Sequence, residues 1–429
     1  MKTFLGKRIS DTEINSDSDL NSDSNSISNS ISDTISASNS NSASKSNLDS
    51  GKKNKLSIII PSLFMIAAVI IELIAWIFPG FSDWYIEHIF PIWINTYGRF
   101  TSIFPFSVGE ILLIIGIVLI IVSVVVLLVY IATKVRNKIC KKVNFNIKFF
   151  GNYFRFLYWT ISIVSLVMVL NCFVLYHATT FSVKYQISEE KHTLEEITIL
   201  RNYVVAELNR LATTADRDEN QELIYKGDML QEAKNSMRDL GKTYPALSGF
   251  YVTPKWIINS DFLSQQSIMG YYFPFSMEAN LNKKMYIINK PATLCHELAH
   301  TKGFIYENEA NFIGYLACIN SDNDFFRYSG YMSVLNYLDR DFYKALGENI
   351  ELYKQYPLVS EQVKADDIFL TKKAWEDVEK KAVLSTETVE NATDHFLTSN
   401  LTMNGVEEGI ASYGEVVDLL LDYYKGILY

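Results

Sequence analysis

The chain has 429 residues, of which 48% are hydrophobic, and its 39 basic and 48 acidic residues give a formal net charge of −9. An acidic chain of this kind argues against a nucleic-acid partner, because binding to nucleic acid is driven by basic surfaces. The length allows more than one domain, and the composition divides the chain into residues 1–50, 51–177 and 178–429.

Residues 1–50 form a tract rich in Ser, Asn and Asp, with stretches such as NSDSDLNSDSNSISNSISD. A segment with so few apolar side chains cannot offset the conformational entropy that folding removes, so we expect a disordered cytosolic tail. The tract also lacks the early apolar run of a signal peptide.

Three long apolar runs follow, at about residues 56–78, 108–132 and 156–176. The second run contains ILLIIGIVLIIVSVVVLLVYIA, which has no charged residue. Since roughly 20 apolar residues match the hydrocarbon thickness of a bilayer, we expect three transmembrane helices in residues 51–177. The first run contains a lone acidic residue, Glu72, to which the sequence assigns no role.

The charges of the loops predict how the chain is oriented. The loop between the second and third runs carries seven basic residues and no acidic one, whereas the loop between the first and second runs holds Asp83, Glu87 and a single basic residue, Arg99. Positively charged loops stay on the cytoplasmic side. We therefore expect a multi-pass protein of the cell membrane, with a cytoplasmic N-terminus and an extracytoplasmic domain in residues 178–429.

The extracytoplasmic part is expected to be mainly α with a small β-sheet. Apolar residues recur with a period near 3.6 in residues 193–212, and residues 227–247 predict a second helix that Gly241 and Pro245 stop. Short aromatic and β-branched segments then predict the sheet; they are residues 249–258, 269–282 and 283–290. Helical patterns return after the sheet and continue to the C-terminus.

The segment PATLCHELAHTKGFIYENEANFIGYLAC, residues 291–318, carries the pattern that points to chemistry. Pro291 fits the first turn of a helix, on which His296 and His300 lie four residues apart and share one face. Two imidazoles so placed can bind one Zn²⁺ ion at about 2.0–2.1 Å each. Glu297 lies to the side of this face, where it can reach a metal-bound water as general base. Cys295 and Cys318 are expected to be small buried residues rather than a disulfide.

A third metal ligand is expected from the residues after the pentapeptide. Gly303 tolerates positive φ and can reverse the chain, so that a helix starting near Tyr306 returns Glu307 to the histidines. Glu309 is the alternative, but it is turned roughly 200° from Glu307 on a helix of 3.6 residues per turn. Glu307 shares its face with Asn311, whose amide can orient an imidazole, and this favours Glu307.

The segment resembles the gluzincin branch of zinc metallopeptidases, in which HExxH is followed by a glutamate in an E-x-x-A/S-D/N setting. Residues 307–311, ENEAN, match that setting, although the interval after His300 is shorter than in many gluzincins. The resemblance implies a zincin-like α+β domain, with His296, His300 and Glu307 as zinc ligands and Glu297 as general base.

More of the chain is similar to an uncharacterised bacterial family of membrane proteins with three N-terminal spans and an outward domain that carries HELAH…EANF. The matching pieces are FPFSVGEILL, YYFPFSMEAN, RYSGYMSVLNYL and GIASYGEVVDLLLDYY, together with the motif. This resemblance implies a peptidase without naming a substrate. It also favours Tyr413 over His395 as the donor that stabilises the oxyanion of the reaction.

Two function classes follow from these observations. The first is a membrane-anchored zinc peptidase that cleaves an extracytoplasmic peptide or protein substrate. The second is a non-catalytic membrane protein whose metal site serves only structure or sensing. A segment with four aromatic residues, Tyr271, Tyr272, Phe273 and Phe275, either packs the interior or forms an edge strand that pairs with an extended substrate. The polar residues around the motif argue against a site inside the hydrocarbon layer; they are Asn289, Lys290, Lys302, Glu307 and Glu309.

Overall fold

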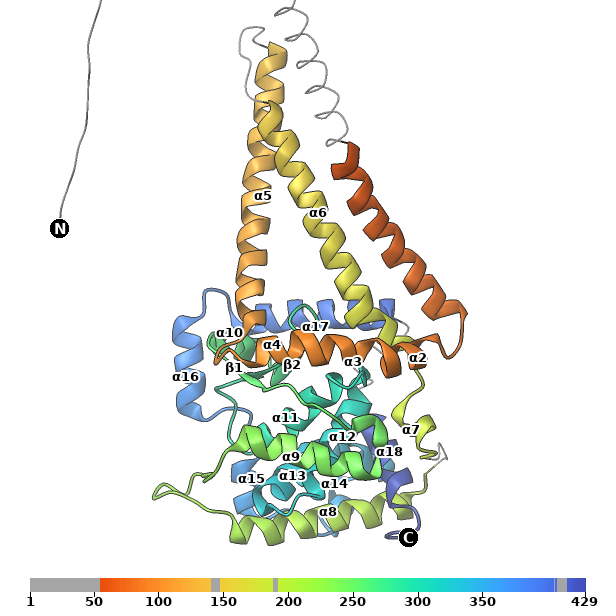
Figure 1. Ribbon diagram of the computed structural model, residues 1–429. Coiled ribbons are helices and arrows are strands. Elements are labelled where there is room, and N and C mark those ends of the chain that lie inside the picture. The colour runs from red at the N-terminus through yellow and green to blue at the C-terminus, as the bar shows by residue number, and fades with distance from the viewer. Residues whose placement is uncertain (1–54, 140–146, 188–191, 405, 407–414) are drawn as a thin grey trace, which may run out of the picture. The chain divides into compact units, whose positions relative to one another are not determined.

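The computed structural model describes residues 55–139, 147–187, 192–404, 406 and 415–429 (Figure 1). The Ser/Asn/Asp tract, Cys140 and Tyr413 lie outside the described residues. Residues Pro61–Tyr429 form one compact unit, distinct from Met1–Ile60. The described chain is mainly helical and contains one three-stranded sheet, which confirms the predicted combination of helices with a small sheet.

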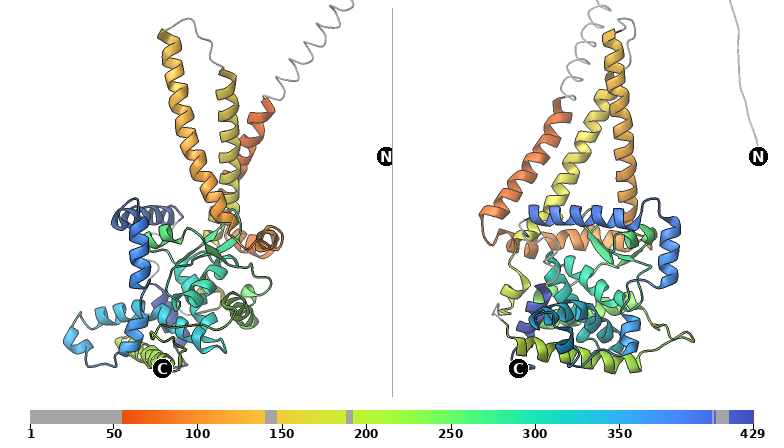
Figure 2. Two further views of the ribbon diagram at one scale, coloured as in Figure 1. Left: turned by 90° about the vertical axis from the view of Figure 1, so that its left-hand side faces the viewer. Right: turned by 180° about the vertical axis from the view of Figure 1, so that it is seen from behind.

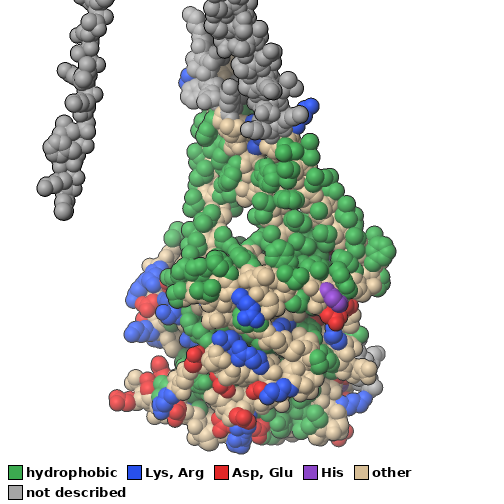
Figure 3. Space-filling model, in the orientation of Figure 1, with side chains coloured by type: hydrophobic (Ala, Val, Ile, Leu, Met, Phe, Trp, Pro, Cys, Tyr) green, Lys and Arg blue, Asp and Glu red, His purple; other side chains and the backbone are tan. Residues whose placement is uncertain are grey.

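Three helices are long and apolar enough to cross a membrane: Lys55–Ile77, Val108–Lys138 and Phe149–His177. The second lies within α5 (Val108–Ile139), and the third comprises most of α6 (Ile147–Asn171) and the short helix η2 (Phe173–His177). Figure 3 shows hydrophobic side chains gathered over these helices, whereas charged side chains gather over the rest of the molecule. Apolar side chains exposed over whole helices indicate a membrane protein, as the sequence predicted.

A nearly continuous helical run connects the first two of these helices, where the sequence predicted only a loop. It consists of α2 (Phe81–His88), α3 (Phe90–Trp93), η1 (Ile94–Gly98) and α4 (Arg99–Ser102), and it lies across the ends of the long helices (Figures 1 and 2). Tyr85 and Phe90 are buried on one side, whereas Ile92 and Phe100 are more than half exposed on the other. The run is therefore amphipathic, as expected of helices that lie along a membrane surface.

The helices predicted from hydrophobic periodicity form the core of the remaining structure. In α8 (Leu194–Thr214), Leu200, Val204, Leu208 and Leu211 recur every three or four residues and are fully buried. Thr193 and Glu196 form a capping box that begins this helix. The other large helices of this core are α9 (Met229–Thr243), α11 (Asn289–His300), α12 (Glu307–Ile319), α13 (Asp324–Ala345) and α18 (Val416–Tyr424).

Shorter elements and one long surface helix complete the structure. They are α7 (Phe181–Lys184), η3 (Pro245–Leu247), α10 (Ser260–Gln265), α14 (Ile350–Tyr353), α15 (Glu361–Asp366), α16 (Lys372–Lys381) and α17 (Thr386–Met403). Figure 2 shows α17 at the same level as the α2–α4 run, next to the ends of the membrane-length helices.

The sheet has the strand order β1-β3-β2. β1 (Lys255–Ile257) is parallel to the central strand β3 (Glu278–Asn282), and β2 (Gly270–Phe273) is antiparallel to β3, so that β2 is an edge strand. The prediction of a further strand in residues 283–290 was wrong, because the chain there turns into α11. The backbone N–H of Lys284 donates to Asn282 Oδ1 and that of Tyr286 donates to Phe369 O, so these donors are used away from the sheet.

The hairpin of β2 and β3 is held between the start of α5 and the end of α6. The Glu278 carboxylate accepts hydrogen bonds from the backbone N–H groups of Val108 and Gly109, at 3.1 and 2.7 Å. At the other end, Asn171 Nδ2 donates to Pro274 O at 3.0 Å, and Tyr272 Oη donates to Asn171 O at 3.3 Å. The membrane-length helices and the sheet therefore share buried polar contacts.

Candidate metal centre

Two helices and a tight turn bring the residues of the pentapeptide motif together with those that follow it. α11 carries Pro291 in its first turn, Gly303 adopts φ +94° in the turn, and α12 begins after Tyr306, as predicted. Gly314 on α12 faces α11 so closely that a Cβ atom there would lie 3.1 Å from the backbone nitrogen of His296. The absence of a side chain at residue 314 therefore lets α12 approach the histidine helix.

The side chains of His296, His300 and Glu307 converge on one point. Their donor atoms all lie within 4.8 Å of one another. The two Nε2 atoms are 3.1 Å apart, and Glu307 Oε2 lies 3.0 Å from His296 Nε2 and 3.7 Å from His300 Nε2. Zinc bonds of about 2.0–2.1 Å at a tetrahedral angle place ligand atoms about 3.3 Å apart, so this spacing fits one ion held by all three residues.

Each imidazole also has a hydrogen-bond partner outside the group of three. His300 Nδ1 lies 2.7 Å from Phe304 O, so when the imidazole is neutral its proton is held on Nδ1 and the Nε2 lone pair faces the point of convergence. His296 forms a side-chain hydrogen bond with Asn311, one turn after Glu307 on α12. Metal-binding histidines usually have such a partner on the other ring nitrogen.

The electrostatics of the three groups favour positive charge at the point where they meet. Burial opposes ionisation of Glu307, but the charges and hydrogen bonds of His300 and His296 hold the pKa of this carboxyl group well below its usual range. Burial also lowers the pKa of His300, but the charge of Glu307 outweighs this effect and raises it to about 9. For His296, burial dominates and lowers the pKa.

Glu297 lies beside this group without belonging to it. Its side chain is buried, and its Oε2 atom has no hydrogen-bond partner among the described residues. Burial raises the pKa of its carboxyl group to about 8, against the lowering effect of the His300 charge. A Cβ atom at Gly270 would lie 2.6 Å from Glu297 Oε1, so the start of β2 passes directly over this carboxylate. An unpartnered buried carboxylate beside an edge strand is suited to exchange a proton with a bound molecule.

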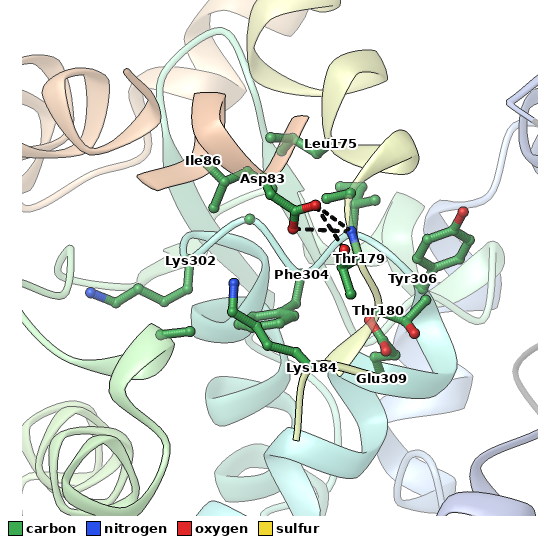
Figure 4. Close-up of a pocket in the computed structure, with 14 residues that line it drawn as sticks. Asp83, Ile86, Leu175, Thr179, Thr180, Lys184, Lys302, Phe304, Tyr306 and Glu309 are labelled. Carbon is green, nitrogen blue, oxygen red and sulfur yellow. Dashed lines mark hydrogen bonds between the residues drawn. The ribbon is translucent and has the colours of Figure 1, made fainter. Parts of the chain in front are cut away.

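Glu309, the alternative ligand, faces a different part of the structure. Its carboxylate accepts hydrogen bonds from the backbone N–H groups of Phe181 and Ser182, and burial raises its pKa to about 7. Figure 4 shows Glu309 at one side of a pocket lined also by Asp83, Thr180 and Lys302. None of the three convergent residues lines this pocket.

The other residues that the sequence suggested, where the structure describes them, differ in their distance from the three convergent side chains. Tyr413 lies outside the described residues, and His395 is exposed on α17. Tyr272 of β2 packs with its ring centroid 6.3 Å from that of His300. Cys295 and Cys318 are free and buried, as predicted.

Two close contacts at the candidate site were not predicted from the sequence, those of Gly270 and Gly314. A glycine inside a strand often marks a close approach of backbone or ligand, so Gly270 could have been noticed. The signal at Gly314 is weaker: a glycine in a helix interior destabilises the helix, which suggests close packing but does not say against what.

A family model described as a protein of unknown function (DUF3810) matches residues 85–421, which include α11, α12 and the sheet. No curated protein and no solved structure shows significant similarity to the chain.

Proposed function

We propose that this chain, which belongs to the DUF3810 family of proteins of unknown function, is a membrane-anchored, zinc-dependent metallopeptidase. The observation that carries the proposal is the convergence of His296, His300 and Glu307 at separations of 3.0–3.7 Å, with the unpartnered carboxylate of Glu297 beside them. The domain would then be zincin-like, and its site gluzincin-like.

The donor set fits Zn²⁺. Two imidazole nitrogens and one carboxylate oxygen form a three-ligand set typical of catalytic zinc, which leaves a further position open, whereas structural zinc sites use four protein ligands. The described residues within reach supply three donors. Zinc in such a set supplies Lewis acidity that polarises a carbonyl group and activates water.

Glu297 would act as the general base. Its carboxylate accepts a proton from the attacking water and passes it to the amine that leaves, so that the OH of the water joins the carbonyl carbon as the C–N bond breaks. Without a cation, burial raises the pKa of this carboxyl group to about 8. A cation nearby would lower this pKa and favour the charged form.

β2 would hold the substrate. It is an edge strand, and its Gly270 lies over Glu297, so a peptide in extended conformation paired with this edge would pass the general base. We propose Tyr413 as the oxyanion donor on the strength of the resemblance alone. The loop charges support placement of this domain outside the cytoplasm.

The test uses the full-length protein in lipid nanodiscs. Metal analysis should give one zinc per chain, a peptide library should be cleaved, and 1,10-phenanthroline should stop cleavage until zinc is restored. Glu297→Gln should keep the zinc and the thermal transition but lower the rate by about 10²–10⁴-fold. Stoichiometric zinc with no cleavage of any library member would reject the peptidase and leave a structural or sensing metal site.

A further inference from the structure

The candidate metal centre lies against the ends of the membrane-length helices. Tyr306, the residue before Glu307, donates its hydroxyl to Tyr176 O at 2.6 Å, and Tyr176 lies in η2 at the end of the third such helix. The turn between α11 and α12 also contacts the α2–α4 run. A Cβ atom at Gly303, in this turn, would lie 3.0 Å from Ile86 Cγ2 of α2. The site is therefore next to the boundary of the membrane rather than on the far side of the domain.

The edge strand β2 runs along the same boundary. Tyr272 bonds to the carbonyl of Asn171 at the end of α6. Tyr271 lies within electrostatic range of both Glu110, in the first turn of α5, and Glu297. A chain paired with β2 would therefore lie close to the end of one membrane-length helix and the start of another.

Exposed apolar side chains lie on α10 and α17 and in the segments just before these helices. We call them the apolar rim: Ile258, Phe262, Val383, Leu384 and Phe396, which are between 50% and 96% exposed. The rim is continuous with the second membrane-length helix, because the backbone N–H of Ile258 donates to Glu110 Oε2 at 3.0 Å. Gln265 Nε2 donates to Leu384 O at 3.0 Å and joins α10 to the start of α17.

The occupant that fits the apolar rim is the lipid bilayer. Large apolar side chains gathered on one surface mark a contact, and this surface borders a helix that is itself expected to lie in lipid. Apolar side chains of this kind enter the boundary between headgroups and acyl chains, as in amphipathic helices that lie in the membrane plane.

We propose that the substrates are membrane-anchored polypeptides, cleaved within the membrane interface in the segment next to their own transmembrane helix. This inference rests on the proposed peptidase function. An anchored chain leaves the bilayer at the height of β2, so its first extended residues can pair with that strand without a search through solution. By contacting lipid, the apolar rim would keep the open edge of β2 at the level of the membrane interface.

The first experiment compares anchored with free substrates. The full-length enzyme is reconstituted in phosphatidylethanolamine/phosphatidylglycerol vesicles with a library of single-span polypeptides whose first 20 residues outside the span are randomised. The same randomised 20-residue segments are supplied as free peptides. We expect the anchored form to be cleaved at least about tenfold faster, at bonds within about ten residues of the span, which an extended chain covers in about 35 Å.

The second experiment tests the apolar rim with matched variants. Leu384→Ser/Phe396→Ser should keep the cleavage of free peptides but lose about tenfold with anchored substrates, because two apolar side chains no longer enter the bilayer. The control is Ile350→Ser/Leu358→Ser, which removes exposed apolar side chains next to α8, where Asn209 donates to Leu358 O. This control should leave both rates unchanged.

A direct measure of contact with lipid accompanies these rates. The fluorescence that a new Trp adds to that of the wild type is measured for Phe396→Trp and for Ile350→Trp. Lipids brominated near the acyl carbonyl should quench the added signal at residue 396 but not at residue 350.

Each outcome decides between the claims. Equal cleavage of free peptides, or cleavage far from the span, would overturn the inference and leave the peptidase intact. No cleavage of either form by the zinc-loaded enzyme would reject the peptidase itself. If the fluorescence is quenched equally at residues 396 and 350, the apolar rim does not contact the bilayer.

Discussion

Glu307 and Glu309 lie two positions apart on α12, yet their carboxylates face different partners. Glu307 lies 3.0 Å from His296 Nε2, whereas Glu309 accepts from the backbone of Phe181 and Ser182. The helical rotation between them, which favoured Glu307 at the level of sequence, agrees with this division. The same rotation explains why Asn311, one turn after Glu307, also lies within hydrogen-bond reach of His296.

Replacing each glutamate with alanine should separate their roles. Glu307→Ala should weaken zinc binding by more than the roughly 10–100-fold that loss of a supporting hydrogen bond causes. Glu309→Ala should keep zinc but lower the free energy of unfolding by about 1–3 kcal/mol, because two buried N–H groups lose their acceptor. Zinc titration and thermal unfolding of the detergent-solubilised chain measure both effects, and a reversed result would make Glu309 the ligand.

Gly270 is the residue of β2 that lies over Glu297, with no room for a side chain. A methyl group there would also meet the carbonyl of Asn280 at 2.9 Å, so Gly270→Ala must displace the strand, the carboxylate or both. We expect kcat to fall at least about tenfold while zinc content stays at one per chain, since a small misplacement of a reacting group is costly. Gly116→Ala is the control, because a Cβ atom at residue 116 has nothing within 4 Å. Equal activity of both variants would contradict the role of this close approach.

At the scale of elements, the start of α5 depends on a residue from the sheet. Glu278 of β3 is 1% exposed, and its carboxylate accepts from the first N–H groups of this helix. Ser276 Oγ donates to the same carboxylate at 2.7 Å. A helix begins with N–H groups that have no partner within the helix, and a carboxylate there also offsets the positive end of the helix dipole.

Glu278→Ala should therefore lower the free energy of unfolding by about 1–3 kcal/mol, because buried donors lose their acceptor. Denaturation of the full-length chain in one detergent, followed by circular dichroism, measures the change. Glu87→Ala, on the exposed face of α2, should change stability far less. A Glu278 variant as stable as the wild type would show that the cap contributes little.

The elements that could be predicted from the sequence are those that are determined by residues within a short segment. α8, α11 and α12 were predicted because periodicity, Pro291 and Gly303 act within a few residues. Residues 283–290 have the composition of a strand, but tertiary contacts such as that of Tyr286 N with Phe369 O decide their path. The contacts of Glu278 with α5 join residues about 170 positions apart, and a single sequence carries no signal for them.

At the scale of the whole molecule, the membrane-length helices and the metal centre share one core. Val174, Leu175 and Phe181, from the end of the third such helix and the segment after it, are buried with Phe312 of α12. A chain of residues 178–429 alone would lose the polar contacts of Asn171 and the apolar cover of this region.

We expect this truncated chain to bind 1-anilinonaphthalene-8-sulfonate and to lack a sharp thermal transition, whereas residues 61–429 in detergent retain one. Exposure of apolar surface that the longer chain buries is the physical reason. A truncated chain that is monomeric and unfolds cooperatively would show that the domain is independent of its anchor. The predicted division of the chain at residue 178 stays a prediction until then.

The candidate site was more predictable than the surface around it. Metal-binding residues depend on side-chain chemistry and helical spacing, both of which HELAH and Glu307 display. The apolar rim combines residues from positions 258–262 and 383–396, and single exposed apolar residues have no signature in sequence.

The sharing of one core between anchor and metal centre has a kinetic consequence. If the chain is the proposed peptidase, the interface between the membrane-length helices and the metal centre would keep the site at the membrane surface. The enzyme would then search for anchored substrates in two dimensions. Its turnover would then depend on molecules per unit area: adding empty lipid at fixed protein amount should slow the reaction, whereas adding buffer should not.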